Sequence, residues 1–455
     1  MRRSRSGLKT WVLVTFLLAL FLVGSISYLG WRQSVPRVSA ELDSPPRFIG
    51  LQTPLSLELT AQRGGVAWVQ LRLVQGAREA VVFQQEFPSP RANRQRVELT
   101  IEGHALGLRE GGARLEVLAR DHFWRPLQFD DRPVVSRPVT LDLTPPVVRL
   151  LYATRYLAQG GSGVVAFRAK NDELGTVHVD ELAFPSFPVG DPEDGTRVAF
   201  IAIPYKAPPT TPLRLILADR AGNQASRTLA SVITRRRFTR TTVHIRQAFL
   251  RRKLPELLPE RGTIPDNELL AAFLEVNRDK RRQAEEAKRV IAAKTQPKAL
   301  WRGAFLHPRN AKVSSNFAET RTYRFRGKKV DTQVHFGYDL ASVRESPVLA
   351  ANAGVVMFAQ PLNIYGLTVV LDHGLGLQTL YAHLSRIAVA VGDQVEKGQV
   401  LGSSGSTGLA AGDHLHYEVL IHGISVTPLE WWDPKWIQQH IISPLQAANV
   451  ALLEE

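Results

Sequence analysis

The chain has 455 residues, which is too long for a single hydrophobic core, so we expect two to four domains. Hydrophobic residues make up 44% and charged residues 22%, a globular composition that argues against wholesale disorder. Lys and Arg outnumber Asp and Glu by 57 to 42, and the net charge of +15 favours an anionic partner. Cysteine is absent, which excludes disulfides and any cysteine-based zinc or nucleophile site.

The first thirty residues predict a membrane anchor. A basic tail over residues 1–10 precedes an uncharged, largely apolar run over residues 11–30. Twenty helical residues span about 30 Å, the thickness of a bilayer's hydrocarbon core. The positive-inside rule keeps such an N-terminus in the cytoplasm and sends the rest of the chain across the membrane. The basic residues of the tail are Arg2, Arg3, Arg5 and Lys9.

A cleaved signal peptide is the alternative interpretation of this segment. Its small-residue cleavage site would be Val38-Ser39-Ala40, which lies far beyond the apolar run. The run is also longer than the apolar core of a usual signal peptide. We therefore expect an uncleaved, single-pass anchor in the inner membrane, with the body of the protein in the periplasm or otherwise outside the membrane. Nucleic acid is then not an expected partner.

Short alternating apolar runs between about residues 45 and 235 predict β-strands, separated by Gly, Pro, Arg and Asp turns. The stretch 113–121 resembles the stretch 213–219, and each ends at an aspartate. The later copy continues into a turn similar to the D-x-A-G-N turn of many bacterial immunoglobulin-like modules. We expect two β-sandwich modules of this kind, over 45–145 and 146–235, acting as spacers.

A helical linker is predicted over residues 245–297. Apolar residues recur there at spacings of three and four, or multiples of them, with charged residues between, which indicates an amphipathic helix of about 28 residues. Asp266 is expected to cap its N-terminus. The helix packs on a neighbouring domain in the simpler interpretation, and covers a site or docks a partner protein in the other. The apolar positions are Leu269, Phe273, Val276, Ala284, Ala287 and Ile291.

The chemistry is concentrated after residue 300, where short histidine-containing motifs occur. Alternate residues of a strand share a face, so His414 and His416 would point to one spot. A catalytic zinc uses three protein ligands and leaves one position open. His335, Asp339 and either His414 or His416 would supply that set. His383 and the remaining histidine of the pair would then orient water and stabilise an oxyanion.

Residues 301–434 resemble the lysostaphin/LytM-type zinc metallopeptidase domain. The resemblance rests on H-F-G-Y-D from residue 335, Y-A-H-L from residue 381, and S-G-S-T-G ahead of H-L-H-Y-E. It implies a compact antiparallel β domain, over about 300–440, with its site in a groove between loops. It also implies that one zinc ion is bound by His335, Asp339 and His416, while His383 and His414 are catalytic.

The function that this resemblance implies is a membrane-anchored endopeptidase. Metal-activated water would hydrolyse peptide bonds in the stem peptides or cross-links of peptidoglycan. Envelope proteins are possible partners through the β modules or the helical linker. The alternative is a non-catalytic wall-binding protein that activates another hydrolase, although such relatives typically lose one or more metal ligands. The other histidines of this region are predicted to be structural, with His373 in an exposed loop: His307, His373, His422 and His440.

The fold class predicted from the sequence is therefore mainly β. It combines an N-terminal transmembrane helix, two immunoglobulin-like β-sandwich modules, a helical linker and a C-terminal antiparallel β peptidase domain.

Overall fold

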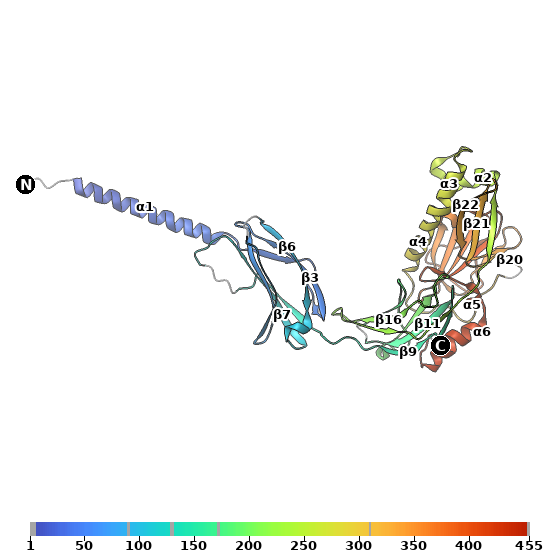
Figure 1. The fold of residues 1–455 in the computed structure, drawn as a ribbon, viewed down its shortest axis with the longest axis horizontal. Helices are drawn as coiled ribbons and strands as arrows, with labels where there is room; N and C mark the ends of the chain where they lie inside the picture. Colours follow the sequence, from blue (N-terminus) through green and yellow to red (C-terminus); the bar gives the residue numbers. More distant parts are fainter. Residues whose placement is uncertain (1–5, 89–91, 128–131, 171–172, 309–310, 453–455) are drawn as a thin grey trace, which may run out of the picture. The chain divides into compact units, whose positions relative to one another are not determined.

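The computed structural model describes residues 6–88, 92–127, 132–170, 173–308 and 311–452 (Figure 1). Arg2, Arg3 and Arg5 of the predicted basic tail lie outside these ranges. The chain forms two compact units. One consists of residues 1–146 with 218–224, and the other of residues 147–217 with 225–455. The described chain is mainly β, with an apolar helix near its N-terminus and a helical segment ahead of the last domain, as predicted.

Helix α1 (Ser6–Ser34) contains the apolar run that the sequence predicts to cross a membrane. Its stretch Thr10–Ser34 has the length and composition of a membrane span, and none of the side chains in its most apolar window is buried. A fully exposed apolar helix requires apolar surroundings, because its surface is unfavourable in water. A signal sequence near the N-terminus has the same properties.

The rest of the first unit contains two sheets with one shared core. A three-stranded sheet has the order β1-β3-β6 and a five-stranded sheet the order β2-β8-β7-β4-β5. Alternate residues such as Leu57 and Leu71 point from the two sheets into the same apolar cluster. This is a sandwich arrangement, built from period-two patterning. The strands are β1 (Ser39–Leu42), β2 (Phe48–Ile49), β3 (Gln52–Thr60), β4 (Val66–Gln75), β5 (Arg78–Glu86), β6 (Arg94–Glu102), β7 (Gly111–Asp121) and β8 (Val135–Leu141).

A second β region opens the second unit, with four-stranded sheets of order β14-β15-β11-β9 and β13-β12-β16-β17 and the pair β10-β18. Its core is continuous with that of the C-terminal domain, because Phe200 contacts Trp431 edge to face and Ser162 hydrogen-bonds Glu430. The strands are β9 (Arg149–Ala153), β10 (Tyr156–Ala158), β11 (Ser162–Arg168), β12 (Leu174–Val179), β13 (Leu182–Pro185), β14 (Phe187–Pro188), β15 (Thr196–Ala202), β16 (Leu213–Ala218), β17 (Gln224–Thr228) and β18 (Val232–Thr234).

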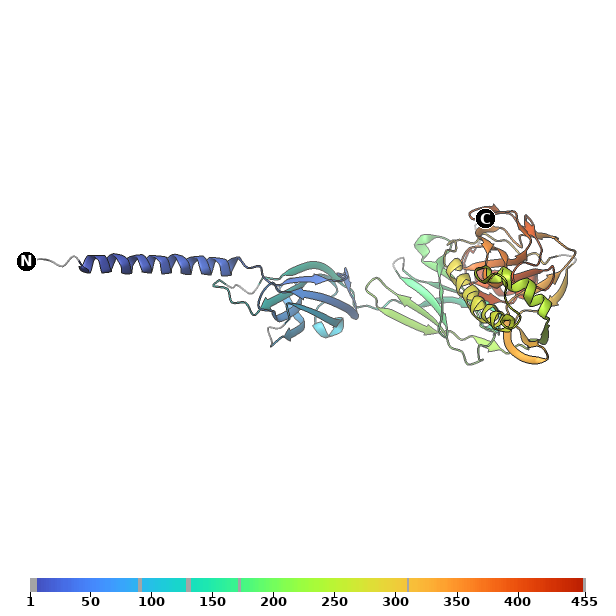
Figure 2. The same cartoon turned by 90° about the horizontal axis from the view of Figure 1, so that it is seen from above.

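The helical segment follows strand β19 (Arg240–Ile245) and contains α2 (Gln247–Leu257), α3 (Leu269–Glu275) and α4 (Arg281–Ala292). A π-helical turn over Val276–Lys280 joins α3 to α4, so the predicted long helix is present as one continuous rod. The capping prediction for Asp266 is wrong: α3 begins after Glu268 without a side-chain cap, and Asp266 pairs instead with Arg251 of α2. Figures 1 and 2 show α4 running along one side of the C-terminal β domain.

The C-terminal domain is built on an antiparallel sheet of order β20-β23-β31-β27-β26-β25-β29, with β32 paired to β31. The central strands β27 and β31 are buried along their whole length, although each contains buried polar residues such as Gln378 and Glu418. The strands of this sheet are β20 (Lys312–Ser315), β23 (Tyr338–Ala341), β25 (Gly354–Pro361), β26 (Leu367–Asp372), β27 (Leu377–Leu384), β29 (Gln394–Val395), β31 (Leu415–Ile421) and β32 (Ile424–Val426).

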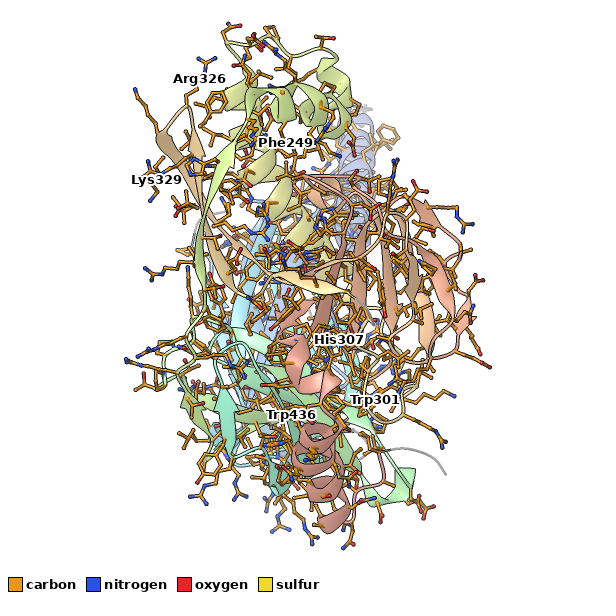
Figure 3. All side chains as sticks on the ribbon, turned by 90° about the vertical axis from the view of Figure 1, so that its right-hand side faces the viewer. Phe249, Trp301, His307, Arg326, Lys329 and Trp436 are labelled. Carbon is orange, nitrogen blue, oxygen red and sulfur yellow. The ribbon has the colours of Figure 1, made fainter. Side chains whose placement is uncertain are left out.

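Two smaller sheets flank it. The sheet β19-β21-β22 joins the helical segment to the domain, since β19 pairs in parallel with β21 (Glu319–Phe325), which pairs with β22 (Lys328–His335). The sheet β24-β30-β28 holds β24 (Pro347–Leu349), β28 (Arg386–Ile387) and β30 (Val400–Ser403). Short helices α5 (Pro428–Trp432), α6 (Pro434–Ile437) and α7 (Ser443–Ala447) follow. Trp301 and Trp436 lie towards one end of this unit and Phe249 towards the other (Figure 3).

Candidate metal centre and active site

Three residues that the sequence predicts as metal ligands come together on neighbouring strands. His335 ends β22 and Asp339 lies in β23, whose register places it opposite His416 of β31. Gly337 lies in the turn between the first two. A Cβ at this position would come within 2.7 Å of the His416 ring, so only glycine allows this close approach.

The geometry of the three side chains fits a metal ion. The distances from His335 Nε2 to Asp339 Oδ1, from His335 Nε2 to His416 Nδ1, and from His416 Nδ1 to Asp339 Oδ1 are all 2.9 Å. Ligands on a tetrahedral ion with bonds of about 2.0–2.1 Å lie slightly further apart, at roughly 3.3 Å. Two imidazole nitrogens and one carboxylate oxygen also form a donor set that zinc prefers. All three residues are buried.

His335, Asp339 and His416 are called the trio below. The second ring nitrogen of each histidine in it has its own hydrogen-bond partner. His335 Nδ1–H donates to the carbonyl of Asn316 at 3.0 Å, and His416 Nε2–H donates to Glu418 Oε1 at 2.8 Å. These bonds fix the tautomers, so that His335 Nε2 and His416 Nδ1 direct lone pairs towards one point. Metal-binding histidines are oriented in this way by carbonyl or carboxylate partners.

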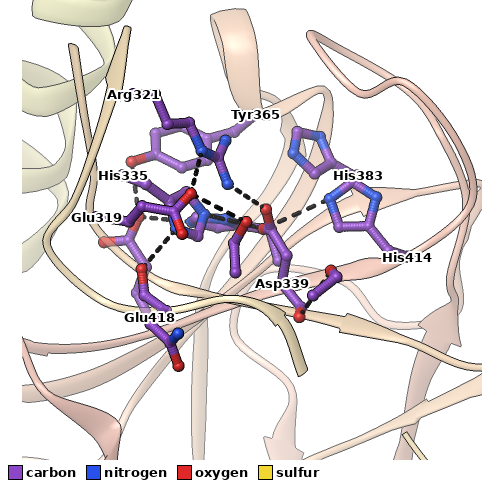
Figure 4. Close-up of polar contacts among 12 residues, drawn as sticks. Glu319, Arg321, His335, Asp339, Tyr365, His383, His414 and Glu418 are labelled. Atoms are coloured by element: carbon purple, nitrogen blue, oxygen red, sulfur yellow. Dashed lines mark hydrogen bonds and ion pairs between the residues drawn. The ribbon is translucent and has the colours of Figure 1, made fainter. Parts of the chain in front are cut away.

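Asp339 uses its second oxygen for an ion pair. Arg321 of β21 donates to Asp339 Oδ2 at 2.7 Å and also to Glu319 Oε1 at 3.1 Å (Figure 4). Burial alone would raise the pKa of Asp339, but His335 and its other hydrogen-bond partners hold that pKa well below its ordinary value. Asp339 is therefore an ionised carboxylate with one oxygen free to face the two histidines.

Burial also governs the protonation of the histidines. It lowers the pKa of His335, despite the opposing Asp339 charge, which favours the neutral ring that a metal ligand must have. Burial acts in the same direction on His416, but hydrogen bonds to Asp339 and Glu418 outweigh it and raise its pKa. Burial and the neighbouring histidines hold the pKa of His383 well below its usual range.

His383 and His414 lie together beside the trio, on the side away from Glu418 (Figure 4). Their ring centres are 4.9 Å apart, and His414 Nε2 lies 3.4 Å from Asp339 Oδ1. His383 Nδ1–H donates to the carbonyl of Thr407, and His414 Nδ1–H donates to that of Gly412. The neutral His383 ring therefore carries its lone pair on Nε2, whereas His414 Nε2 faces the Asp339 carboxylate, to which only an N–H can donate.

The backbone at His383 is in the left-handed region, with φ at +61°. This conformation is rare for a residue with a side chain and persists only where its surroundings hold it. The Gly- and Ser-rich loop provides that support, because the hydroxyl of Thr407 donates to the Leu384 carbonyl and accepts from the backbone N–H of Leu367. The loop therefore stabilises the strained backbone at His383.

A pocket of about 620 Å³ contains all five of these side chains. One wall comes from the C-terminal domain, and the other from β19, α2 and the rod formed by α3 and α4. That second wall, called the basic wall below, contains Arg246, Arg252 and Arg281. Arg246 and Arg252 make no ion pair with any residue that the structure describes. Arg281 hydrogen-bonds Asn277.

The structure corrects one prediction about the other histidines of this region. His373 was expected in an exposed loop, but it is fully buried, and its ring nitrogens contact the Ala353 carbonyl at 2.7 Å and Thr379 Oγ1 at 2.8 Å. Burial lowers its pKa to about 4, so it stays neutral as a packing residue. His307, His422 and His440 contact aromatic rings and do not line the pocket.

Sequence reasoning missed several polar residues around the trio. Glu418 had a usable signal, because it lies two residues after His416 and therefore on the same strand face. Arg321 and Glu319 follow a turn that gave no hint of a site. Lys288 of α4, which contacts Glu418, comes from the segment predicted as a linker.

The fold and the site define a metallopeptidase-type domain, and comparisons with known proteins agree. Residues 333–428 match peptidase family M23. The chain is 43% identical over 97 residues to the DD-carboxypeptidase/endopeptidase Mpg of Neisseria meningitidis serogroup B, covering 21% of this chain and 22% of that protein. It is 38% identical over 119 residues to the peptidoglycan DD-endopeptidase ShyA of Vibrio cholerae serotype O1, covering 26% of this chain and 27% of that protein.

Among solved structures, the catalytic domain of lysostaphin from Staphylococcus simulans is 27% identical, with a TM-score of 0.24, and the match covers 27% of this chain and 92% of that one. The matched regions span 22% of the length of Mpg and 27% of the length of ShyA, so the chain covers only a part of each relative. Within this chain, residues 333–428 form a peptidase M23 domain of the lysostaphin/LytM type, as the sequence motifs indicated.

Proposed function

We propose that this protein is a zinc metalloendopeptidase that cleaves peptide bonds in the stem peptides or cross-links of peptidoglycan. One zinc ion is bound by His335, Asp339 and His416. The observation that carries the proposal is the convergence of three ligand atoms, 2.9 Å from one another, beside two further histidines in one pocket. The names of the relatives in Neisseria and Vibrio support peptidoglycan as the substrate.

Zinc in this position supplies Lewis acidity, which polarises a peptide carbonyl and makes water a nucleophile near neutral pH. His383 is neutral and directs Nε2 into the pocket, so it accepts and returns a proton there. His414 Nε2 lies 3.4 Å from Asp339 Oδ1, beside the trio, and when it carries a proton it donates to the oxygen that becomes negative in the transition state. Arg321 holds Asp339 in place.

The basic wall of the pocket fits the same substrate class. Peptides with free carboxylates are attracted to a groove lined by arginines, and Arg246 and Arg252 are available for them. The walls also keep part of the substrate out of water, which strengthens each electrostatic contact in the site.

For the rest of the chain we propose the arrangement that the sequence predicts. Helix α1 anchors the protein in the inner membrane, and the catalytic domain lies on the periplasmic side. The length and apolar composition of α1 support this, together with the basic tail before it. The two β regions act as immunoglobulin-like modules: the first is a spacer that sets the reach of the catalytic domain, and the second is joined to that domain by a shared core. Both offer surfaces to envelope proteins.

The test is digestion of purified sacculi by the full-length protein in detergent, with product masses identifying the bond. We expect peptide products from the protein loaded with one zinc ion, and none after the metal is removed by a chelator. Asp339→Ala is the control, because it removes one ligand. A zinc-loaded protein that binds sacculi without cleaving them would overturn the proposal and favour a non-catalytic activator of another hydrolase.

A further inference from the structure

Lys288 of helix α4 is a charged residue at an apolar position. Its side chain is completely buried, on the face of the rod that packs against the C-terminal domain. Burying a lone ammonium group costs several kcal/mol unless other groups compensate it. A lysine at such a position therefore requires acidic or hydrogen-bonding partners around its ammonium group.

The partners of Lys288 are hydrogen-bond acceptors, three of them in the C-terminal domain and the fourth, Glu285, in α4 itself. Its Nζ lies 2.8 Å from Glu418 Oε2, 2.8 Å from Glu285 Oε2, 3.1 Å from the Tyr365 hydroxyl and 3.1 Å from Ser425 Oγ. Glu418 is itself completely buried, so the two charges neutralise one another inside the domain.

The second oxygen of Glu418 contacts a predicted metal ligand. Glu418 Oε1 accepts from His416 Nε2–H at 2.8 Å and lies 2.6 Å from the Tyr365 hydroxyl. The opposite nitrogen of His416, Nδ1, faces Asp339 and His335. An unbroken series of contacts thus runs from helix α4 through one carboxylate to a predicted metal ligand.

The geometry makes Lys288 the residue that fixes the carboxylate. Ser425 Oγ–H donates to Glu418 Oε2 at 2.7 Å, on the same oxygen as Lys288, so Oε1 is left to face His416. Without the lysine, Glu418 would keep the hydroxyls of Ser425 and Tyr365 but lose the ammonium group that pairs with its Oε2. The carboxylate would then orient the His416 ring less firmly.

We propose that Lys288 is a positioning residue for the metal ligand His416, acting through Glu418. The helical segment then contributes a functional group to the metal centre, although it lies outside the residues that match the peptidase family. This inference rests on the proposed function only in that the trio binds zinc; it does not require the substrate to be peptidoglycan.

The experiment measures the zinc affinity of the full-length protein in detergent, by competition with a chromophoric chelator. Lys288→Met keeps the length of the side chain and removes its charge. We expect its zinc affinity to fall by up to about 10-fold, the lower end of the effect of losing the direct partner of a metal-binding histidine, because Glu418 is still present but less firmly held. The visible spectrum of the cobalt-substituted protein should also change, because the His416 ring is no longer held.

The matched control is Arg278→Gln. It removes a second ion pair between this rod and the β domain, that of Arg278 with Asp331, for which the described residues show no contact with the trio. We expect the zinc affinity and cobalt spectrum of this variant to match the wild type. Equal losses in both variants would show that the rod acts only by general stabilisation, and would overturn the proposal.

A second variant separates positioning from folding. Lys288→Met leaves the buried Glu418 carboxylate without its ammonium partner, which destabilises the fold by itself. The double variant Lys288→Met with Glu418→Gln has no such charge, so its thermal stability should recover while its zinc affinity stays low. Recovery of both would assign Lys288 a structural role alone. A wild type that binds zinc but cleaves no sacculi would overturn the proposed function and leave this result standing.

Discussion

His414 and His416 are two residues apart, yet they have different surroundings. His416 is buried in β31, with one nitrogen towards Asp339 and the other on Glu418. His414 precedes the strand and keeps 15% of its side chain exposed, facing His383 across the pocket. Shared strand-face geometry explains why the two come as a pair, whereas their different depths and partners explain why only one belongs to the trio.

The division of roles predicts different results for two substitutions at this pair. His414→Ala should retain about one zinc ion per chain, as a site with three protein ligands does, because the trio is intact. Its cleavage rate should fall by roughly 10²–10⁴-fold, the usual effect of losing a proton-transfer or oxyanion partner.

The measurement pairs metal analysis with a cleavage assay on purified wall fragments. His416→Ala is the comparison, and it should lose both zinc and cleavage. Full activity in His414→Ala would remove its catalytic role, and loss of zinc in that variant would make it a ligand.

At the residue scale, the trio could be predicted because its members lie in short motifs, where spacing and strand periodicity limit the geometry. Arg321 was not predicted, because the short Arg326-Gly327 turn indicates only that β21 pairs with the strand ending at His335, and not that the arginine reaches Asp339. Lys288 did leave a signal that was not used: it lies four residues after Ala284, on the apolar face of the amphipathic helix.

Among the elements, the helical segment and β19 differ most between the sequence prediction and the structure. The sequence predicts a linker over 245–297, with packing on a neighbouring domain as the simpler role of its helix. In the structure β19 extends the β21–β22 hairpin by parallel pairing, and this wall closes one side of the pocket. Parallel pairing between segments about 80 residues apart leaves no local sequence pattern, so it could not be predicted from the chain.

The basic wall predicts an effect on substrate binding. Arg246→Gln and Arg252→Gln should each raise the KM for a peptide with free carboxylates by about 3- to 10-fold, since a charge-assisted bond at an exposed site is worth at most about 1.5 kcal/mol. The value of kcat should stay nearly constant, because neither residue touches the predicted ligands or catalytic histidines. Added salt should reduce the difference between variant and wild type.

Arg251→Gln is the matched control for this series. Arg251 belongs to the same helix but pairs with Asp266 and does not line the pocket. Steady-state kinetics on peptides with free and amidated carboxylates provides the measurement. An unchanged KM in both wall variants, or an equal increase with the amidated peptide, would contradict carboxylate recognition by this wall.

At the scale of the whole molecule, the second β region belongs with the catalytic domain rather than with the first β region. Its sequence predicts a separate module, because turn residues and strand periodicity look alike in both regions. What joins it to the C-terminal domain is a set of long-range contacts. The Ser162 backbone N–H donates to Glu430 at 2.8 Å, and Trp431 Nε1–H donates to Ser162 Oγ at 3.1 Å. Such contacts have no signature in either segment alone.

This junction should make the stability of the second unit depend on pH. Burial raises the pKa of Glu430 to about 7, with Arg236, 3.9 Å away, as the charged group opposing that shift. The folded state therefore binds this proton more tightly than the unfolded chain, in which glutamate titrates near 4.5. The favourable contribution is complete below pH 4.5 and is lost as pH rises through 7. A difference of about 2.5 pKa units corresponds to roughly 3 kcal/mol.

Glu430→Gln tests this directly, because glutamine keeps an oxygen for Ser162 but does not ionise. We expect the variant and the wild type to unfold at similar temperatures at pH 5. At pH 8 the variant should unfold at a temperature several degrees higher, since the wild type must then bury an ionised carboxylate. Thermal unfolding of the full-length protein between pH 5 and pH 8 measures both curves. Curves that remain parallel across this range would show that Glu430 stays ionised in the folded protein, and that the junction does not respond to pH.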